Sequence, residues 1–115
     1  MHGDVSFIEL GSIETDTGRS EVFFEKIFGW HFHPMPQGSG WFQAPRIRVG
    51  LHGNDSGPGI YVFFEVSNLE EAIAIVRNAG GEADPPVTEE PGFGRFANCR
   101  DPQGIRFGLH QRSVD

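Results

Sequence analysis

The sequence has few of the features that mark several large protein classes. Its single cysteine, Cys99, excludes an intrachain disulfide and a cysteine-rich zinc site. The chain has nine Lys and Arg residues and sixteen Asp and Glu residues. The resulting formal net charge of −7 argues against nucleic-acid binding, which needs a basic face. No apolar run approaches the roughly 20 residues of a membrane span. A dinucleotide-binding glycine fingerprint, a P-loop and a recognisable Ser-His-Asp constellation are also missing.

The N-terminus and the cysteine point to an ordinary intracellular domain. Met1 to Asp4 lack the basic and then apolar pattern of a secretory signal, so we expect a cytoplasmic protein. Cys99 follows Phe96, Ala97 and Asn98 in a strand-like run with no base nearby, which predicts a buried bystander rather than a nucleophile. Hydrophobic residues make up 37% of the chain, and eleven phenylalanines can fill a core and line a pocket.

The chain contains a weak internal repeat of strand, helix and three strands. The pattern predicts a strand at 7–13, a helix at 19–28 and strands at 30–34, 40–44 and 47–52, and then a strand at 61–66, a helix at 69–79 and strands at 82–88, 94–100 and 105–110. Neither half is long enough for a core of its own. We therefore predict one α+β domain over 1–115, with module one at about 5–52, a polar flexible linker at 53–59 and module two at about 60–111.

Both predicted helices have end signals and an apolar face. Asp16 or Thr17 is the candidate N-cap of the first helix, and Ser67 with Glu70 has capping-box spacing before the second. The positions expected to be buried are Leu69, Ala72, Ile73 and Val76 in the second helix, and the pairs Phe23/Ile27 and Phe24/Phe28 in the first.

Three motifs in this order resemble the vicinal-oxygen-chelate superfamily, which includes glyoxalases, bleomycin-resistance proteins and dioxygenases. They are the helix end FFEKIFGW at 23–30, FEVSNL at 64–69 and DPQG at 101–104. The resemblance implies two βαβββ modules whose curved sheets form an open cup. In metal-dependent members, one ligand from each of four strands holds a divalent ion. Metal-free members include bleomycin-sequestering proteins, often homodimers, and we expect a homodimer here.

Placing the resemblance on this sequence by strand alternation gives four aligned positions: Glu9, Arg48, Tyr61 and Gly108. An arginine stays charged in proteins and repels a cation, and glycine offers no side-chain ligand. We therefore expect no metal, although a divalent ion remains the alternative. The residues predicted to face the cup are Glu9, Arg46, Arg48, His52, Tyr61, Phe63, Arg106 and His110. His31, His33, His52 and His110 are expected to be exposed strand-end histidines.

The predicted ligand-binding residues combine aromatic walls with a polar floor. Tyr61, Phe63, Trp41 and Phe96 form the walls, and Glu9 lies against Arg48. One interpretation of the floor is a salt bridge that fills the former metal position. The other is that Arg48, with Arg46 or Arg106, clamps a carboxylate or phosphate while Glu9 acts as a base or orients the ligand. The loop at 91–95 is either a flap carrying Phe93 or a plain hairpin.

The resulting function prediction is binding of a small organic molecule in a metal-free cup, for sequestration or resistance. One alternative is an enzyme, either a metal-dependent glyoxalase-like lyase of the lactoylglutathione lyase type or a dioxygenase-like protein. Another is a small-molecule-responsive accessory protein. Expected partners are a small-molecule ligand and a second copy of the chain, with no nucleic acid and no membrane.

Overall fold

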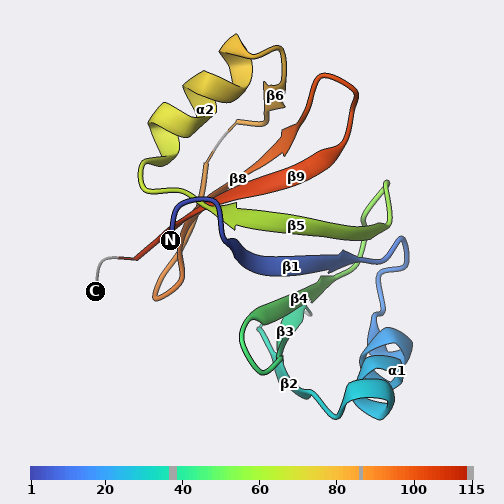
Figure 1. Cartoon of the computed structure of the whole chain (residues 1–115). Coiled ribbons are helices and arrows are strands. Elements are labelled where there is room, and N and C mark those ends of the chain that lie inside the picture. The colour runs from blue at the N-terminus through green and yellow to red at the C-terminus, as the bar shows by residue number, and fades with distance from the viewer. Residues whose placement is uncertain (37–38, 86, 114–115) are drawn as a thin grey trace. The chain divides into compact units, whose positions relative to one another are not determined.

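The computed structural model of the chain describes residues 1–36, 39–85 and 87–113 (Figure 1). It forms two compact units, one made of residues 7–61 and the other of residues 1–6 with 62–115. No helix in these described ranges is long and apolar enough to cross a membrane.

The unit of residues 7–61 contains one helix and a four-stranded sheet. Its elements are β1 (Val5–Gly11, which starts in the other unit), α1 (Gly18–Phe28), β2 (His31–Pro34), β3 (Gly40–Gln43) and β4 (Arg48–His52). The strand order is β2-β3-β4-β1, with β1 parallel to β4 and the other pairs antiparallel. β5 (Gly59–Glu65) begins at the end of this unit and continues in the other.

The other unit repeats this plan. After β5 come α2 (Leu69–Asn78), β6 (Glu82–Ala83), β7 (Thr88–Glu90), β8 (Gly94–Arg100) and β9 (Arg106–Arg112). The order is β5-β9-β8-β6, and β7 also pairs with β8. The predicted βαβββ repeat is therefore confirmed, with one correction. The strand expected over 82–88 is two short strands, and residue 86 lies outside the described residues.

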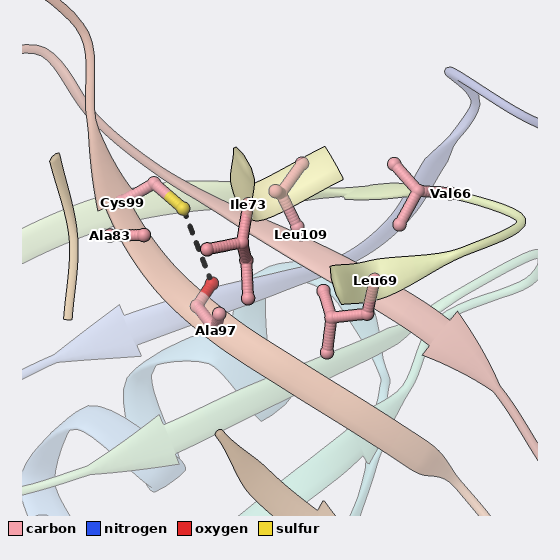
Figure 2. Packing of buried hydrophobic residues seen from close by; sticks show 7 residues of the cluster. All are labelled: Val66, Leu69, Ile73, Ala83, Ala97, Cys99 and Leu109. Carbon is pink, nitrogen blue, oxygen red and sulfur yellow. Dashed lines mark hydrogen bonds between the residues drawn. The ribbon is translucent and has the colours of Figure 1, made fainter. Parts of the chain in front are cut away.

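The expectation that neither half is long enough for a core was wrong, because each unit has its own hydrophobic core. Each core is built by the alternation expected of the strands. The core of the first unit consists of Leu10, Phe42, Ala44, Val49 and Leu51. That of the second consists of Val66, Leu69, Ile73, Ala83, Ala97, Cys99 and Leu109 (Figure 2). Burial raises the pKa of the Cys99 thiol to about 11, so it stays protonated and unreactive at neutral pH. This confirms Cys99 as a buried residue of the core.

The first helix departs from the sequence prediction, because none of its residues is buried. Phe24 packs against Trp30 and Phe42, with ring centroids 6.5 and 6.1 Å away. Phe23, Ile27 and Phe28 are instead more than half exposed. The prediction that both pairs face the core was therefore wrong for these three residues. Phe24 contacts Phe42 of the sheet, while Phe28, the last residue of the helix, stacks on Trp30 with ring centroids 4.4 Å apart.

The helix ends also differ in detail. Thr17 is the N-cap of α1 without a side-chain hydrogen bond, while Asp16 Oδ1 accepts from the Gly18 N–H at 2.8 Å. The N-cap of α2 is Asn68, whose Oδ1 accepts from the Glu71 N–H at 3.0 Å. The capping box of Ser67 and Glu70 was wrong, since an extended Asn68 can cap the helix one residue later.

Two isoleucines on α2 test this packing. Ile73 is 9% exposed and Ile75 is 59% exposed. We expect Ile73→Ala to lower the free energy of unfolding by about 2–4 kcal/mol, because it leaves a cavity among well-packed neighbours. The matched Ile75→Ala variant should cost less than about 1 kcal/mol. Urea unfolding of both variants measures the difference, and equal losses would contradict the assigned core.

Candidate functional site

One row of residues crosses all four strands of the first unit. His33 pairs with Trp41, Trp41 with Gly50, and Gly50 with Glu9. Residues paired across neighbouring strands present their side chains on the same face of the sheet. An imidazole, an indole and a carboxylate thus lie on one face, with a glycine between the last two.

Glycines make room for two carboxylates beside this row. A Cβ added at Gly50 would overlap the Glu9 carboxylate, and one added at Gly11 would overlap that of Asp55. Gly11 pairs with His52 just as Glu9 pairs with Gly50. Glu9, Gly11, Gly50 and His52 therefore form a square of neighbouring positions on β1 and β4, with the two glycines at opposite corners. The Glu9 carboxylate covers Gly50, and the Asp55 carboxylate covers Gly11.

His52 lies between these two carboxylates. Its Nδ1 is 2.5 Å from Glu9 Oε2, and its Nε2 is 3.1 Å from Asp55 Oδ2. A carboxylate only accepts, so both ring nitrogens donate when both bonds form, and this requires the imidazolium. The hydrogen bond to Glu9 raises the pKa of His52 above its ordinary value, and Asp55 adds to the effect against partial burial.

Tyr61 joins the same group, since its hydroxyl donates to Asp55 Oδ2 over a long 3.4 Å. The side chains of Glu9, His52 and Asp55 are 21%, 29% and 9% exposed, so the charges are shielded but not removed from solvent. Sequence reasoning had placed Glu9 and Tyr61 in the site but missed Asp55, which was assigned to a flexible linker. The only available signal was Gly11 and Gly50, whose roles emerge only once the strands are paired.

Arg48 and Trp41 form a second group on this face. The guanidinium carbon lies 4.1 Å from the indole centroid, and the His33 ring stacks on the same indole at 4.0 Å with an interplanar angle of 12°. Two flat groups this close to one centroid must lie on opposite faces of the ring. The indole is thus sandwiched, and cation–π attraction favours this position of the Arg48 guanidinium.

The expected salt bridge between Glu9 and Arg48 was wrong. Arg48 pairs with Phe7 rather than with Glu9, two residues away along the strand. Within the described residues, the ion-pair partner of Glu9 is His52. The same register explains why His52, expected to be an exposed strand-end histidine, contacts Glu9 directly.

The other predicted site residues lie in the second unit. Phe63 is buried, its ring packs edge-on against Phe96 at 5.6 Å, and its strand neighbour is Gly108. Arg106 is half-buried on β9, where it pairs with Arg100.

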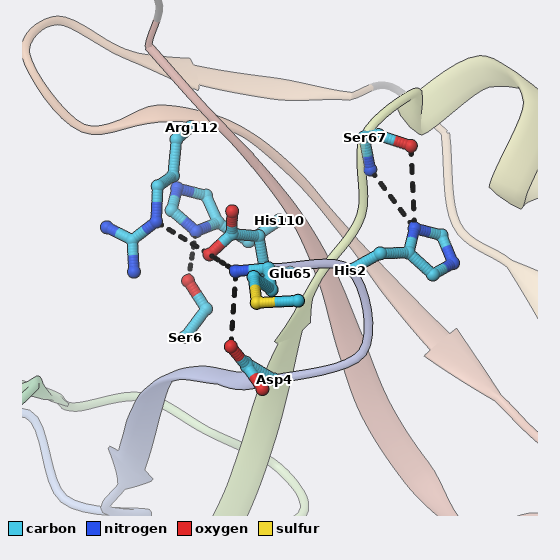
Figure 3. A network of polar contacts seen from close by, with 8 residues as sticks. His2, Asp4, Ser6, Glu65, Ser67, His110 and Arg112 are labelled. Carbon is cyan, nitrogen blue, oxygen red and sulfur yellow. Dashed lines mark hydrogen bonds and ion pairs between the residues drawn. The ribbon is translucent and has the colours of Figure 1, made fainter.

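His110, expected to be an exposed strand-end residue, is fully buried. Its Nε2–H donates to the Phe93 carbonyl at 2.9 Å, which leaves Nδ1 to accept from the Ser6 hydroxyl (Figure 3). Burial lowers the pKa of His110, so this ring is neutral. Phe93 stacks on the ring at 4.2 Å and closes the hairpin between β7 and β8. The plain-hairpin interpretation of this loop therefore describes the structure better than a free flap.

Comparison with known proteins found no matching family model and no matching curated protein. Solved structures do match. A glyoxalase/bleomycin resistance protein/dioxygenase superfamily member from Vibrio splendidus 12B01 has a TM-score of 0.67 at 17% identity, over 93% of this chain and 97% of that one. Methylmalonyl-CoA epimerase from Streptomyces coelicolor has a TM-score of 0.66 at 13% identity, over 99% and 97% of the two chains.

A third match is to a larger protein. Homoprotocatechuate 2,3-dioxygenase from Brevibacterium fuscum has a TM-score of 0.72 at 16% identity, over 97% of this chain and 38% of the dioxygenase. This chain has the vicinal-oxygen-chelate fold. The fold predicted from the three sequence motifs is thereby confirmed, while the low identities leave function to be argued from the site.

The positions at which a vicinal-oxygen-chelate protein would hold a metal do not fit one here. Glu9 is the only carboxylate among them, and its β4 neighbour is Gly50 rather than a ligand. Gly108 has no side chain, and the Phe63 ring lies where its Cβ would be. A divalent ion needs about three or four donor groups. Nor does the described part of the chain group three His, Cys, Asp or Glu side chains around a point where an ion could bind.

Substitution of Gly50 tests the square of β1 and β4. We expect Gly50→Ala to push the Glu9 carboxylate away, because the two would overlap. The pKa of His52 should then fall toward its ordinary value, with a loss of about 1–2 kcal/mol of stability at pH 6 for the weakened charge-assisted hydrogen bond. NMR titration of the His52 ring measures the first effect. Gly18→Ala is the control, since its Cβ would meet only the flexible end of Asp16.

The charge on His52 also predicts a pH dependence of stability. Because the folded-state pKa of His52 is raised, its ion pairs stabilise the fold fully below the unfolded pKa of about 6.5. That contribution is lost as the pH rises through the folded-state pKa. The stability difference between wild type and His52→Gln should therefore shrink from pH 6 to pH 9 in urea unfolding. A growing difference for His52→Gln would contradict the assignment.

Proposed function

We propose that this protein binds a small aromatic carboxylic acid on the β1–β4 face and does so without a metal ion. The observation that carries the proposal is the Arg48 guanidinium carbon positioned over the Trp41 ring, 4.1 Å from its centroid. Guanidinium presents a planar fork of N–H donors that matches a carboxylate, and stacking fixes the fork before the ligand arrives. Less side-chain entropy is then lost on binding.

The surrounding side chains support an aromatic ligand. The edge of the indole and the imidazole stacked on it lie next to the charged groups. Sites for small organic molecules combine such surface with a few placed polar groups. A glyoxalase-like lyase or dioxygenase-like enzyme that depends on a metal would need ligands that Arg48 and Gly108 do not supply. The homodimer, and the role as an accessory protein, remain predictions.

The test is calorimetric titration of chelator-treated protein with benzoate. Wild type should bind benzoate, and Arg48→Gln should bind it about tenfold more weakly, the value of one hydrogen bond to a charged group. Arg19→Gln is the control, because Arg19 is an exposed arginine of the same unit paired with Glu14. Cyclohexane carboxylate should bind more weakly than benzoate if the rings contribute. Binding that appears only on addition of zinc or iron(II) would refute the proposal and favour the enzyme alternative.

A further inference from the structure

We propose that His31 and His33 form a binding site for a divalent transition-metal ion of the kind that prefers imidazole ligands, such as copper(II) or zinc. The pair lies on strand β2 of the first unit. The four positions that the family resemblance assigned to a metal lie instead on β1, β4, β5 and β9. The inference is independent of the proposed function, because it uses neither the Arg48 guanidinium nor the carboxylates that bind His52.

The strand places both imidazoles on one face of the sheet. His31 and His33 are two residues apart, so their side chains project to the same side from Cα atoms about 6.6 Å apart. Phe32 lies between them and projects to the other side, where its ring is 5.0 Å from that of the buried Phe42. This contact fixes the orientation of the strand and thereby turns both histidines away from the core.

The separation of the two rings suits a shared ion. Their centroids are 4.7 Å apart, and their planes are inclined at 87°. An imidazole nitrogen binds zinc at about 2.0–2.1 Å, and it lies about 1.1 Å from its own ring centroid. Two rings that share one ion therefore have centroids about 4.5 Å apart at a right angle and about 5.1 Å apart at a tetrahedral angle. The observed separation lies in this range, so binding needs rotation of the rings but no movement of the strand.

The ring nitrogens of this pair are available as ligands. In the part of the chain that the structure describes, neither ring takes part in a hydrogen bond or an ion pair, and their contacts are with each other and with Trp41. His52 and His110 differ, because protein groups bind both of their ring nitrogens. Neutral imidazole is a preferred ligand of copper, zinc and nickel.

The two histidines have different surroundings, and together they make an anchored and open site. His33 is half-buried and stacks on Trp41 at 4.0 Å, so it loses little freedom when it binds an ion. His31 is exposed on β2, the outermost strand in the order of this unit. Water can therefore supply the remaining ligands of an ion that needs about four.

The charges of the chain permit a cation at this position. Arg48 is the cation on the indole next to His33, but it lies on the opposite face of that ring, as shown above. The indole thus separates the guanidinium from the imidazole pair. The formal net charge of −7 also favours the approach of a cation over that of an anion.

The test is titration of the chelator-treated chain with copper(II) chloride at pH 7, followed by tryptophan fluorescence. Copper held by His33 lies beside Trp41, and copper(II) quenches the emission of a nearby indole. Wild type should show quenching that saturates at one ion per chain. His31→Gln and His33→Gln should each weaken it at least about tenfold, because a two-point attachment becomes a single one.

His2→Gln is the control, since His2 is an exposed histidine of the other unit. It should leave the quenching unchanged. His31→Gln is the more stringent of the two test variants, because it leaves the stacking of His33 on Trp41 in place. Quenching that is equally strong in His31→Gln and wild type, or that disappears in His2→Gln, would overturn the inference.

A second measurement identifies the ligands directly with zinc, which is not paramagnetic. The ring ¹⁵N signals of His31 and His33, each identified by its loss in the corresponding variant, should shift together on addition of zinc, while that of His52 stays in place. A shift of His52 alone would place the ion at the Glu9 and Asp55 carboxylates and rule out a site on β2. Neither measurement involves benzoate, so failure of the proposed function leaves this inference to stand or fall separately.

Discussion

The register between β1 and β4 is the constraint on which the candidate site depends. It pairs Glu9 with Gly50 and Gly11 with His52. Each acidic side chain can lie over a glycine only because the pairing places that glycine beside it. A slip by one residue would turn the whole set to the other face of the sheet. The apolar residues of β4, Val49 and Leu51, are buried on that other face, so hydrophobic burial fixes the register and the register fixes the charges.

Sequence patterns predicted the fold well, because it follows from local periodicity. The repeat of strand, helix and three strands is visible in alternating apolar residues. Leu69 and Ile73, expected on the buried face of α2, are part of the core. The exposed apolar residues of α1 were not predictable in this way. Phe23 and Phe24 are the same residue type at neighbouring positions. Contact with Trp30 and Phe42 sets the helix rotation that packs Phe24 against these rings and leaves Phe23 exposed. Periodicity identifies an apolar face but not how much of it a partner covers.

The site was predicted only in part, for a different physical reason. Glu9, Arg48, Trp41 and Tyr61 were all named, but their partners depend on strand pairing and on a loop. Alignment placed Arg48 beside Glu9, whereas the pairing offsets them by two residues and brings His52 into contact instead. Asp55 could not have been found from the sequence, since a polar stretch with three glycines looks like a linker whether or not one of its side chains folds back.

The two described histidines with shifted pKa values show how surroundings decide the chemistry of one residue type. His110 faces a carbonyl and a hydroxyl, and burial keeps it neutral, so it serves as a fixed hydrogen-bonding group in the second unit. His52 has carboxylates on both nitrogens, which keep it charged while leaving it partly open to solvent. A charged ring bonded to a strand residue on one side and a loop residue on the other is fixed in orientation, and it links β1 to the loop after β4.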